Sequence, residues 1–359
     1  MKKSKICIIT PRSINDSPCL EKYKEIIKDP FDIIFWSKGE NNVKFEAANS
    51  YKYTGIVPVE GGKLSKIKHY YLFTRFAKRI VERNKYDKLI IFPTHMAWLL
   101  QRLLGRKYKG KYILDIRDYA GENNILIRRM TAKAVNNSGL CVITSPSYTR
   151  FLPKNASYTI SHNIQTIDEK LVERYRAKKR DPSKPIVMSF IGTVRFLEQQ
   201  KKLISTFGND HRFVIKYIGR GSEALKSYCM NGKYANVELV GQFDKASLGK
   251  YYYDTDMAIN VYGNNDPALV YALSNKLYSV AQMGMPILCS PKTYMESISS
   301  KFGFGISVDL NNPNCCDYVY NSFYSLGSSK LYSNCDSFIN KVQLDEVKFN
   351  KKVKRFLNQ

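Results

Sequence analysis

Short apolar segments alternate with helix-length segments along nearly the whole chain, and this alternation limits the folds open to it. Ten short segments are apolar at successive positions and rich in β-branched or aromatic residues: 6–10, 31–36, 88–92, 111–116, 140–145, 186–191, 213–218, 237–240, 257–261 and 286–289. Strands buried on both faces of a parallel sheet have this composition. Helix-length segments lie between them, at 64–84, 97–105, 199–207 and 275–283. We therefore expect βαβ units and a doubly wound α/β fold.

The chain is long enough for about two domains. Segment 166–185 is polar, carries six basic residues before Asp-Pro-Ser-Lys-Pro, and separates two series of strand-like segments. We expect Rossmann-like domains over 1–165 and 186–335, with 166–185 as a linker and a ligand cleft between the domains. Apolar residues at helical spacing (Phe349, Val353, Phe356 and Leu357) predict an amphipathic helix in 336–359 that packs back on the first domain.

Composition excludes several classes of protein. Hydrophobic residues (44%) and charged residues (25%) occur in the proportions of a globular chain. No uncharged apolar stretch reaches about 18 residues, so we expect no transmembrane helix. The eight Cys form no CxxC pair and do not group with the four His, so we expect no metal site. The net charge of +26 suits a nucleic acid, an anionic membrane or a phosphorylated substrate.

Glycines follow two strand-like segments of the second half. Gly192-Thr193-Val-Arg195 leads into a helix-like stretch with Lys201 and Lys202, which suits a diphosphate at a helix N-terminus. A plain turn with solvated cations is the alternative. Tyr217-Ile-Gly219-Arg-Gly221 starts like a dinucleotide fingerprint but lacks its third glycine, so a tight turn is the simpler interpretation.

A third candidate begins the helix expected at 275–283. Ser274-Asn275-Lys276 supplies a cation and amide donors, which also suit a phosphate. A simple N-cap is the alternative.

Two further candidates lie in the first half. Asp115-Ile-Arg-Asp118 follows an expected strand, and His95 follows another, so these side chains can face a cleft. The alternative is an Asp–Arg pair with Asp118 as a helix cap. One helical stripe holds Lys68, Arg75, Arg79 and Arg83 with aromatic residues between them, which suits an anionic bilayer or a solvated outer helix.

In this order the motifs resemble those of GT-B glycosyltransferases of the family 4 type, particularly those of bacterial capsule and O-antigen clusters. The similarity covers nearly the whole chain. It rests on Asp115-Ile-Arg-Asp118, Cys141-Val-Ile-Thr-Ser145 with Ile160-Ser-His162-Asn163, Phe190-Ile-Gly192, Tyr217-Ile-Gly219-Arg-Gly221, Gly241-Gln-Phe243, Asn275-Lys276-Leu277-Tyr278 and Gly284-Met-Pro286.

The resemblance implies sugar transfer from a nucleoside-diphosphate sugar to a polyprenyl-diphosphate-linked saccharide, with retention and without a metal or other cofactor. The net charge and the basic segment 63–85 suit a peripheral enzyme at the cytoplasmic face of an anionic membrane. The sequence has no RRM, KH or helix-turn-helix signature, so we expect no nucleic-acid partner. Donor-binding positions by resemblance are Gly192, Thr193, Arg195, Lys201, Lys202, Gly219, Gly241, Gln242, Phe243, Asn275, Lys276 and Ser279. Acceptor-side positions are Arg12, Asp16 and Asp115, with Asp118 or His95 to orient or deprotonate the acceptor hydroxyl.

One position departs from the family pattern. The family has a Glu for the ribose hydroxyls where this chain has Ser279, and a Ser contacts hydroxyls more weakly than a carboxylate does. A catalytically degenerate homologue is therefore an alternative. A sugar-nucleotide epimerase on the same scaffold and, from charge alone, a nucleic-acid-binding protein are the others.

Overall fold

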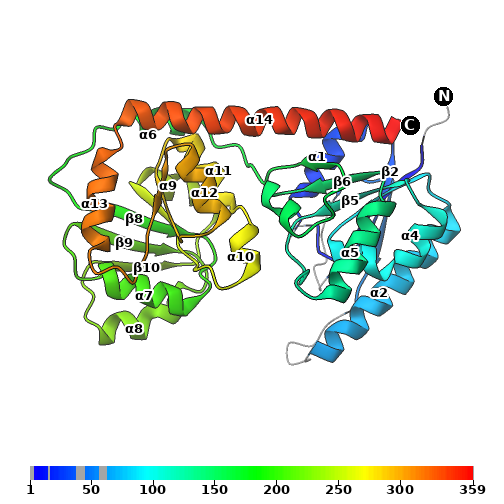
Figure 1. Cartoon of the computed structure of the whole chain (residues 1–359), viewed down its shortest axis with the longest axis horizontal. Coiled ribbons are helices and arrows are strands. Elements are labelled where there is room, and N and C mark those ends of the chain that lie inside the picture. The colour runs from blue at the N-terminus through cyan, green and yellow to red at the C-terminus, as the bar shows by residue number, and fades with distance from the viewer. Residues whose placement is uncertain (1–3, 15–16, 38–44, 56–62, 359) are drawn as a thin grey trace. The chain divides into compact units, whose positions relative to one another are not determined.

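The computed structural model describes residues 4–14, 17–37, 45–55 and 63–358 (Figure 1). Two compact units divide the chain. Unit 1 comprises 1–162 and 344–359, and unit 2 comprises 163–343. Each unit has its own parallel sheet and its own core.

The sheet of unit 1 has the order β3-β2-β1-β4-β5-β6-β7, and every pair is parallel. Its strands are β1 (Ile6–Thr10), β2 (Phe31–Trp36), β3 (Asn49–Tyr53), β4 (Lys88–Ile91), β5 (Tyr112–Ile116), β6 (Leu140–Ile143) and β7 (Tyr158–Ile160). The reversal between β1 and β4 is that of a doubly wound fold. Strands β3 and β7, which the sequence did not predict, are the two edges.

The sheet of unit 2 has the equivalent order β10-β9-β8-β11-β12-β13, again parallel throughout. Its strands are β8 (Ile186–Ile191), β9 (Phe213–Ile218), β10 (Val237–Gly241), β11 (Met257–Asn260), β12 (Ile287–Cys289) and β13 (Gly305–Ser307). All ten predicted strands are therefore confirmed, and both sheets share one topology.

Helices cover both faces of the unit 1 sheet (Figure 1). One face carries α1 (Cys19–Ile26) and the end of α14 (Ser328–Asn358), where Phe349 meets Tyr23 edge to face at 5.6 Å between ring centroids. The other face carries α2 (Lys63–Asn84), α3 (Thr94–Leu99), α4 (Gln101–Lys107) and α5 (Ile125–Asn137). The single helix predicted at 97–105 is two helices, because Leu100 leaves the helical conformation between them.

Unit 2 is built in the same way. Its first face carries α7 (Leu197–Phe207), α8 (Lys226–Asn231) and α13 (Cys315–Ser325). Its second face carries α6 (Glu169–Ala177), α9 (Leu248–Tyr253), α11 (Asn275–Met283), α12 (Tyr294–Lys301) and the start of α14, while the short α10 (Pro267–Tyr271) contacts α12. Short 3₁₀ helices span Pro146–Arg150, Ser222–Leu225 and Lys245–Ser247.

The segment expected as a linker, 166–185, lies inside unit 2 and forms α6. Apolar side chains of this basic helix, Leu171, Val172 and Tyr175, pack on the core beside α11. Their spacing of three to four residues gives α6 one apolar stripe. Because most of the other residues of α6 are charged, the composition of the segment alone indicates a linker.

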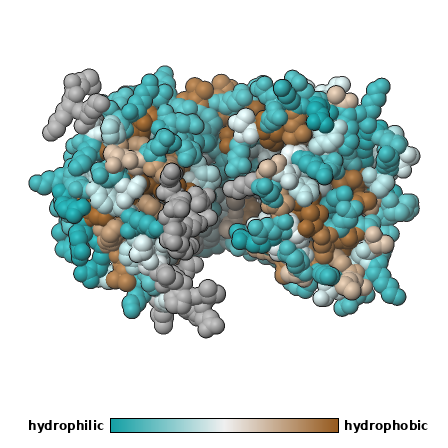
Figure 2. Space-filling view, turned by 180° about the vertical axis from the view of Figure 1, so that it is seen from behind, coloured by the Kyte–Doolittle hydropathy of each residue, from teal (hydrophilic) through white to brown (hydrophobic). Residues whose placement is uncertain are grey.

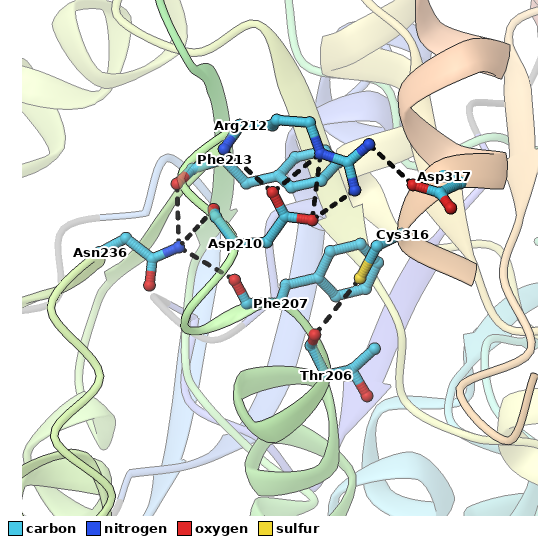
Figure 3. A network of polar contacts seen from close by, with 8 residues as sticks. All are labelled: Thr206, Phe207, Asp210, Arg212, Phe213, Asn236, Cys316 and Asp317. Carbon is cyan, nitrogen blue, oxygen red and sulfur yellow. Dashed lines mark hydrogen bonds and ion pairs between the residues drawn. The ribbon is translucent and has the colours of Figure 1, made fainter. Parts of the chain in front are cut away.

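The turn between α7 and β9 is fixed by a polar network (Figure 3). Arg212 donates through Nε and Nη2 to Asp210, at 2.9 and 2.6 Å, and its Nη1 lies 2.7 Å from Asp317 on α13. The amide of Asn236 donates to the carbonyl oxygens of Phe207, Asp210 and Phe213 at 2.9–3.0 Å. The amino ends of β9 and β10 are thereby tied to the helices that cover them.

Hydrophilic residues cover much of one face of the molecule (Figure 2). Hydrophilic side chains are spread widely over the face shown in Figure 2, and hydrophobic ones are scattered between them. Within the described ranges, no helix is both long enough and apolar enough to cross a bilayer.

Candidate functional site

The loops after β8 and β9 press against each other at the carboxyl edge of the unit 2 sheet. Gly192 N donates to Ile218 O at 2.8 Å, and Val194 N donates to Arg220 O at 2.9 Å. A Cβ on Gly219 would lie 2.0 Å from Gly192 O, so only glycine fits there. Gly192 has φ +125° and open space where its Cβ would be. Its backbone is therefore open to a close approach by a ligand.

Lys276 is the most unusual side chain at this edge. Ser274 caps the start of α11 by accepting from the Lys276 amide, and the Lys276 side chain turns into the protein, where it is only 6% exposed. Its Nζ donates to Tyr262 Oη at 2.9 Å and lies 3.3 Å from the ring centroid of Phe190. Burial lowers the pKa of Lys276 well below its usual value. No carboxylate of the described residues forms an ion pair with it.

Arg195, in the loop after β8, adds a second positive charge to this edge, and its side chain is exposed. Burial raises the pKa of Tyr262, and the charge of Arg195 opposes that rise. Phe196 has a left-handed backbone (φ 55°) and contacts the Tyr262 ring edge to face at 5.7 Å. Thr193 is exposed in the same loop. The edge thus combines two cations, free of carboxylate partners in the described chain, with exposed backbone.

Lys201 and Lys202 each contact another side chain of unit 2. Lys201 Nζ lies 2.8 Å from Glu198, and Lys202 donates to the Asn311 side chain. Their role at a diphosphate stays a prediction.

The remaining predicted donor positions line the same edge. Gly241 is the last residue of β10 and donates from its amide to Ser222 Oγ at 3.1 Å, and Gln242 is exposed beside it. Phe243 packs edge to face on Tyr251 at 5.1 Å. Asn275 is exposed at the start of α11, one turn before Ser279.

Ser279 has a partner of its own. The buried Tyr252 phenol shares a side-chain hydrogen bond with Ser279, which offsets part of the rise that burial causes in the pKa of Tyr252. The position where the resemblance places a ribose-binding carboxylate therefore holds a Ser–Tyr pair.

Three predicted residues gather at the carboxyl edge of the unit 1 sheet. Arg12 follows β1 and pairs with Asp118, which follows β5, at 3.0 Å. His95, which follows β4, meets the ring of Tyr70 on α2 edge to face at 4.9 Å between ring centroids. Burial raises the pKa of Tyr70, and the charge of Arg12 opposes that rise. Asp16 lies outside the described residues.

Asp115 has a different place. It is fully buried, accepts from Tyr23 Oη at 2.8 Å and pairs with Arg117 at 2.7 Å. Of the two interpretations from sequence, the Asp–Arg pair describes Asp115. Asp118 pairs with Arg12 and caps no helix that the structure describes, and α5 is capped by Asn124 instead.

Sequence reasoning missed three polar side chains of these edges. Tyr262 and Asn260 lie at or just beyond the end of β11, and buried Asn260 Oδ1 has no hydrogen-bond partner among the described residues. The rule that ligands bind beyond the carboxyl ends of strands would have selected both. Tyr70 lies on a helix, and no local signal marks it. In the described ranges, no three His, Cys, Asp or Glu side chains gather as a metal site requires.

The sequence matches no protein-family model and no curated protein. Solved structures match over the whole chain. Sucrose-phosphate synthase of Thermosynechococcus elongatus has a TM-score of 0.72 at 12% identity, over 99% of this chain and 100% of that one. Anabaena HepE in complex with UDP has a TM-score of 0.68 at 10% identity, over 99% of both chains. The chain has the GT-B fold.

WaaG, a glycosyltransferase involved in lipopolysaccharide biosynthesis, matches in the same way, with a TM-score of 0.63 at 10% identity over 98% of this chain and 99% of that one. In the GT-B fold of this chain, unit 1 corresponds to the first Rossmann-like domain and unit 2 to the second. The predicted α/β class is therefore confirmed.

Proposed function

We propose that this chain is a glycosyltransferase that takes a sugar from a nucleoside-diphosphate sugar. One observation carries the proposal: the carboxyl edge of the unit 2 sheet holds Arg195, the buried Lys276 and a glycine, Gly192, with open space where its Cβ would be. A diphosphate is the ligand that such cations and amides suit. A GT-B neighbour, HepE, was solved with UDP and with UDP-glucose, which supports the nucleotide-sugar class.

The proposed chemistry follows from charge. Breaking the bond between sugar and diphosphate places negative charge on the leaving group, and fixed cations stabilise that charge best where water is excluded. Lys276 lies in such a place, and an approaching diphosphate would favour its charged form. With Arg195 it gives the site a means of neutralising the leaving group from side chains alone, so we propose transfer without a metal.

We propose that the acceptor meets the Arg12–Asp118 edge of unit 1. The Asp118 side chain remains 61% exposed although it pairs with Arg12, so its carboxyl group is accessible to orient or deprotonate a hydroxyl. His95 is the second candidate at this edge. A lipid-linked saccharide, retention of the anomeric configuration and a role in capsule or O-antigen synthesis complete the proposal.

The decisive experiment is a panel of UDP, GDP, CDP, ADP and dTDP, each with and without Mg²⁺, measured by calorimetry and by thermal shift. We expect one nucleotide to bind, and we expect Arg195→Ala to weaken that binding about tenfold or more. Arg174→Ala, an exposed arginine on α6, is the matched control and should leave binding unchanged. Absence of binding by every nucleotide at millimolar concentration would refute the proposal.

Ser279 favours one second candidate, a GT-B homologue that holds a nucleotide sugar without transferring it. Turnover separates the two. A transferase releases nucleoside diphosphate when the acceptor is added, whereas a degenerate homologue binds the nucleotide and releases nothing.

Contact with an anionic membrane surface rests on α2. Lys68, Arg75, Arg79 and Arg83 are all exposed. Two apolar side chains of the same helix, Ile67 and Tyr71, are 63% and 57% exposed. A basic helix with exposed apolar residues suits an anionic bilayer surface, where a peripheral protein of the cytoplasmic leaflet would bind.

Vesicle co-sedimentation tests this surface. We expect binding to vesicles that contain phosphatidylglycerol and none to phosphatidylcholine alone. Changing the four α2 cations to Gln should abolish that binding. The control changes four exposed cations of α14 (Lys351, Lys352, Lys354 and Arg355) to Gln, which alters the net charge equally. Equal loss in both variants would show that net charge alone attracts the protein and would contradict an α2 surface.

A further inference from the structure

A basic pocket lies at the amino edge of the unit 2 sheet, opposite the candidate donor site. Its cavity of about 660 Å³ includes Asp256 and Pro286, which directly precede β11 and β12. Basic residues after α6 (Lys178, Lys179 and Arg180) and aromatic residues at the end of α13 (Phe323 and Tyr324) form much of its wall. The candidate donor site is at the carboxyl ends of the same strands, so the two sites are separate.

Two aromatic rings hold the Arg180 guanidinium in this pocket, but one of its N–H donors has no acceptor among the described residues. Its guanidinium carbon lies 3.7 Å from the ring centroid of Phe323 and 4.9 Å from that of Tyr324. Tyr324 Oη donates to Pro182 O at 3.4 Å, which ties the ring to the segment that follows Arg180. Arg180 Nη2 is buried and has no hydrogen-bond partner among the described residues.

Two other arginines of unit 2 have acceptors for their guanidinium groups. Arg212 has two carboxylate partners, Asp210 and Asp317 (Figure 3). Arg176, in the wall of the same pocket, pairs with Asp336 at 2.7 Å and donates to two backbone carbonyl oxygens. Buried donors are rarely left unpaired in native proteins, so the unpaired Nη2 of Arg180 indicates a missing acceptor.

The charge of the pocket indicates what kind of acceptor fits. Lys179 is exposed and has no partner in the described chain, and Lys178 donates only to the Tyr253 carbonyl oxygen, at 3.3 Å. Asp256 is the one carboxylate in the wall, and it already accepts from Val187 N at 2.9 Å. Positive charge therefore exceeds negative charge where the open guanidinium donor lies.

We infer that this pocket binds a small molecule that carries a phosphate or diphosphate group. A planar guanidinium stacked on an aromatic ring is preorganised to donate two parallel hydrogen bonds to phosphate oxygens. Lysine side chains add mobile point charges, and the rings of the wall can cover the organic part of the ligand. The inference does not depend on the proposed donor site, because no residue is shared.

Calorimetry with inorganic pyrophosphate tests the inference on the full chain. We expect two binding sites in the unaltered protein, one at Arg195 and one at Arg180. Arg180→Ala and Arg195→Ala should each leave one site, and the double variant should leave none.

Further variants guard against misfolding. Lys179→Glu changes an exposed side chain and should weaken the Arg180 site about tenfold or more without changing the melting temperature. Lys170→Glu, an exposed lysine of α6 outside the pocket, is the matched control and should have no effect.

The possible results separate this inference from the proposed function. If Arg180→Ala and Lys179→Glu leave pyrophosphate binding intact, the pocket is not a phosphate site. If Arg180→Ala removes a site and Arg195→Ala does not, the pocket is confirmed and the donor site fails. Loss of binding to phosphatidylglycerol vesicles in both pocket variants, with pyrophosphate binding intact, would identify a lipid headgroup and overturn the small-molecule assignment.

Discussion

Lys276 is stable in its buried place only because an aromatic ring and one phenol stand in for water. Such an arrangement costs folding free energy, because a neutral side chain of the same length would be buried more easily. We expect Lys276→Met to keep or raise the melting temperature while weakening nucleotide binding at least tenfold. Thermal denaturation and calorimetry measure the two effects. A lower melting temperature with intact nucleotide binding would make Lys276 a structural residue.

We expect the buried His162 to make the free energy of unfolding depend on pH. It is buried, its Nε2 lies 3.3 Å from Asp345, and Glu346 and Lys22 are its other charged neighbours. Burial lowers the pKa of His162 more than the hydrogen bond to Asp345 raises it. The unfolded chain therefore takes up this proton at a higher pH than the folded one, so stability falls as the pH drops below about 6.5.

Urea denaturation at pH 7.5, 6.5 and 5.5 measures this contribution. His162→Gln should flatten the fall in the free energy of unfolding over that interval. Equal slopes in the variant and the unaltered protein would show that other groups cause the acid sensitivity.

At the scale of elements, the loops after β8 and β9 are in direct contact, because Gly219 has no Cβ to separate them. A Cβ there would meet Gly192 O at 2.0 Å, and φ is already +142°. We expect Gly219→Ala to cost about 2 kcal/mol or more and to weaken nucleotide binding by displacing Gly192. Gly327→Ala has open space around its Cβ and is the control. Unchanged binding in Gly219→Ala would separate these loops from the site.

The sequence predicts some elements better than others for a physical reason. Central strands such as β8 are buried on both faces, so their composition marks them. The edge strand β3 reads Asn-Ser-Tyr-Lys-Tyr and is half exposed, so it has no such mark. The site follows the same division. Arg12, Asp118, Arg195 and Lys276 sit where strands or helices end or begin, whereas the Lys276–Tyr262 contact depends on tertiary packing that no motif encodes.

At the scale of the whole molecule, one helix serves two cores. Phe338 of α14 packs in unit 2, against Phe302 at 5.3 Å, and Phe349 of the same helix packs in unit 1. Both side chains are buried, and truncating a buried Phe to Ala typically costs about 3–5 kcal/mol. The two residues thus allow the same change to be made in either unit on a single element.

We expect Phe349→Ala to lower the unfolding temperature of unit 1 and leave nucleotide binding by unit 2 intact. Phe338→Ala should do the reverse, weakening unit 2 and its nucleotide binding. Differential scanning calorimetry with and without the nucleotide identifies the transitions, because a ligand raises only the transition of the unit that binds it. Should both variants shift a single transition equally, α14 couples the two units into one cooperative whole, and the units are not separable in energy.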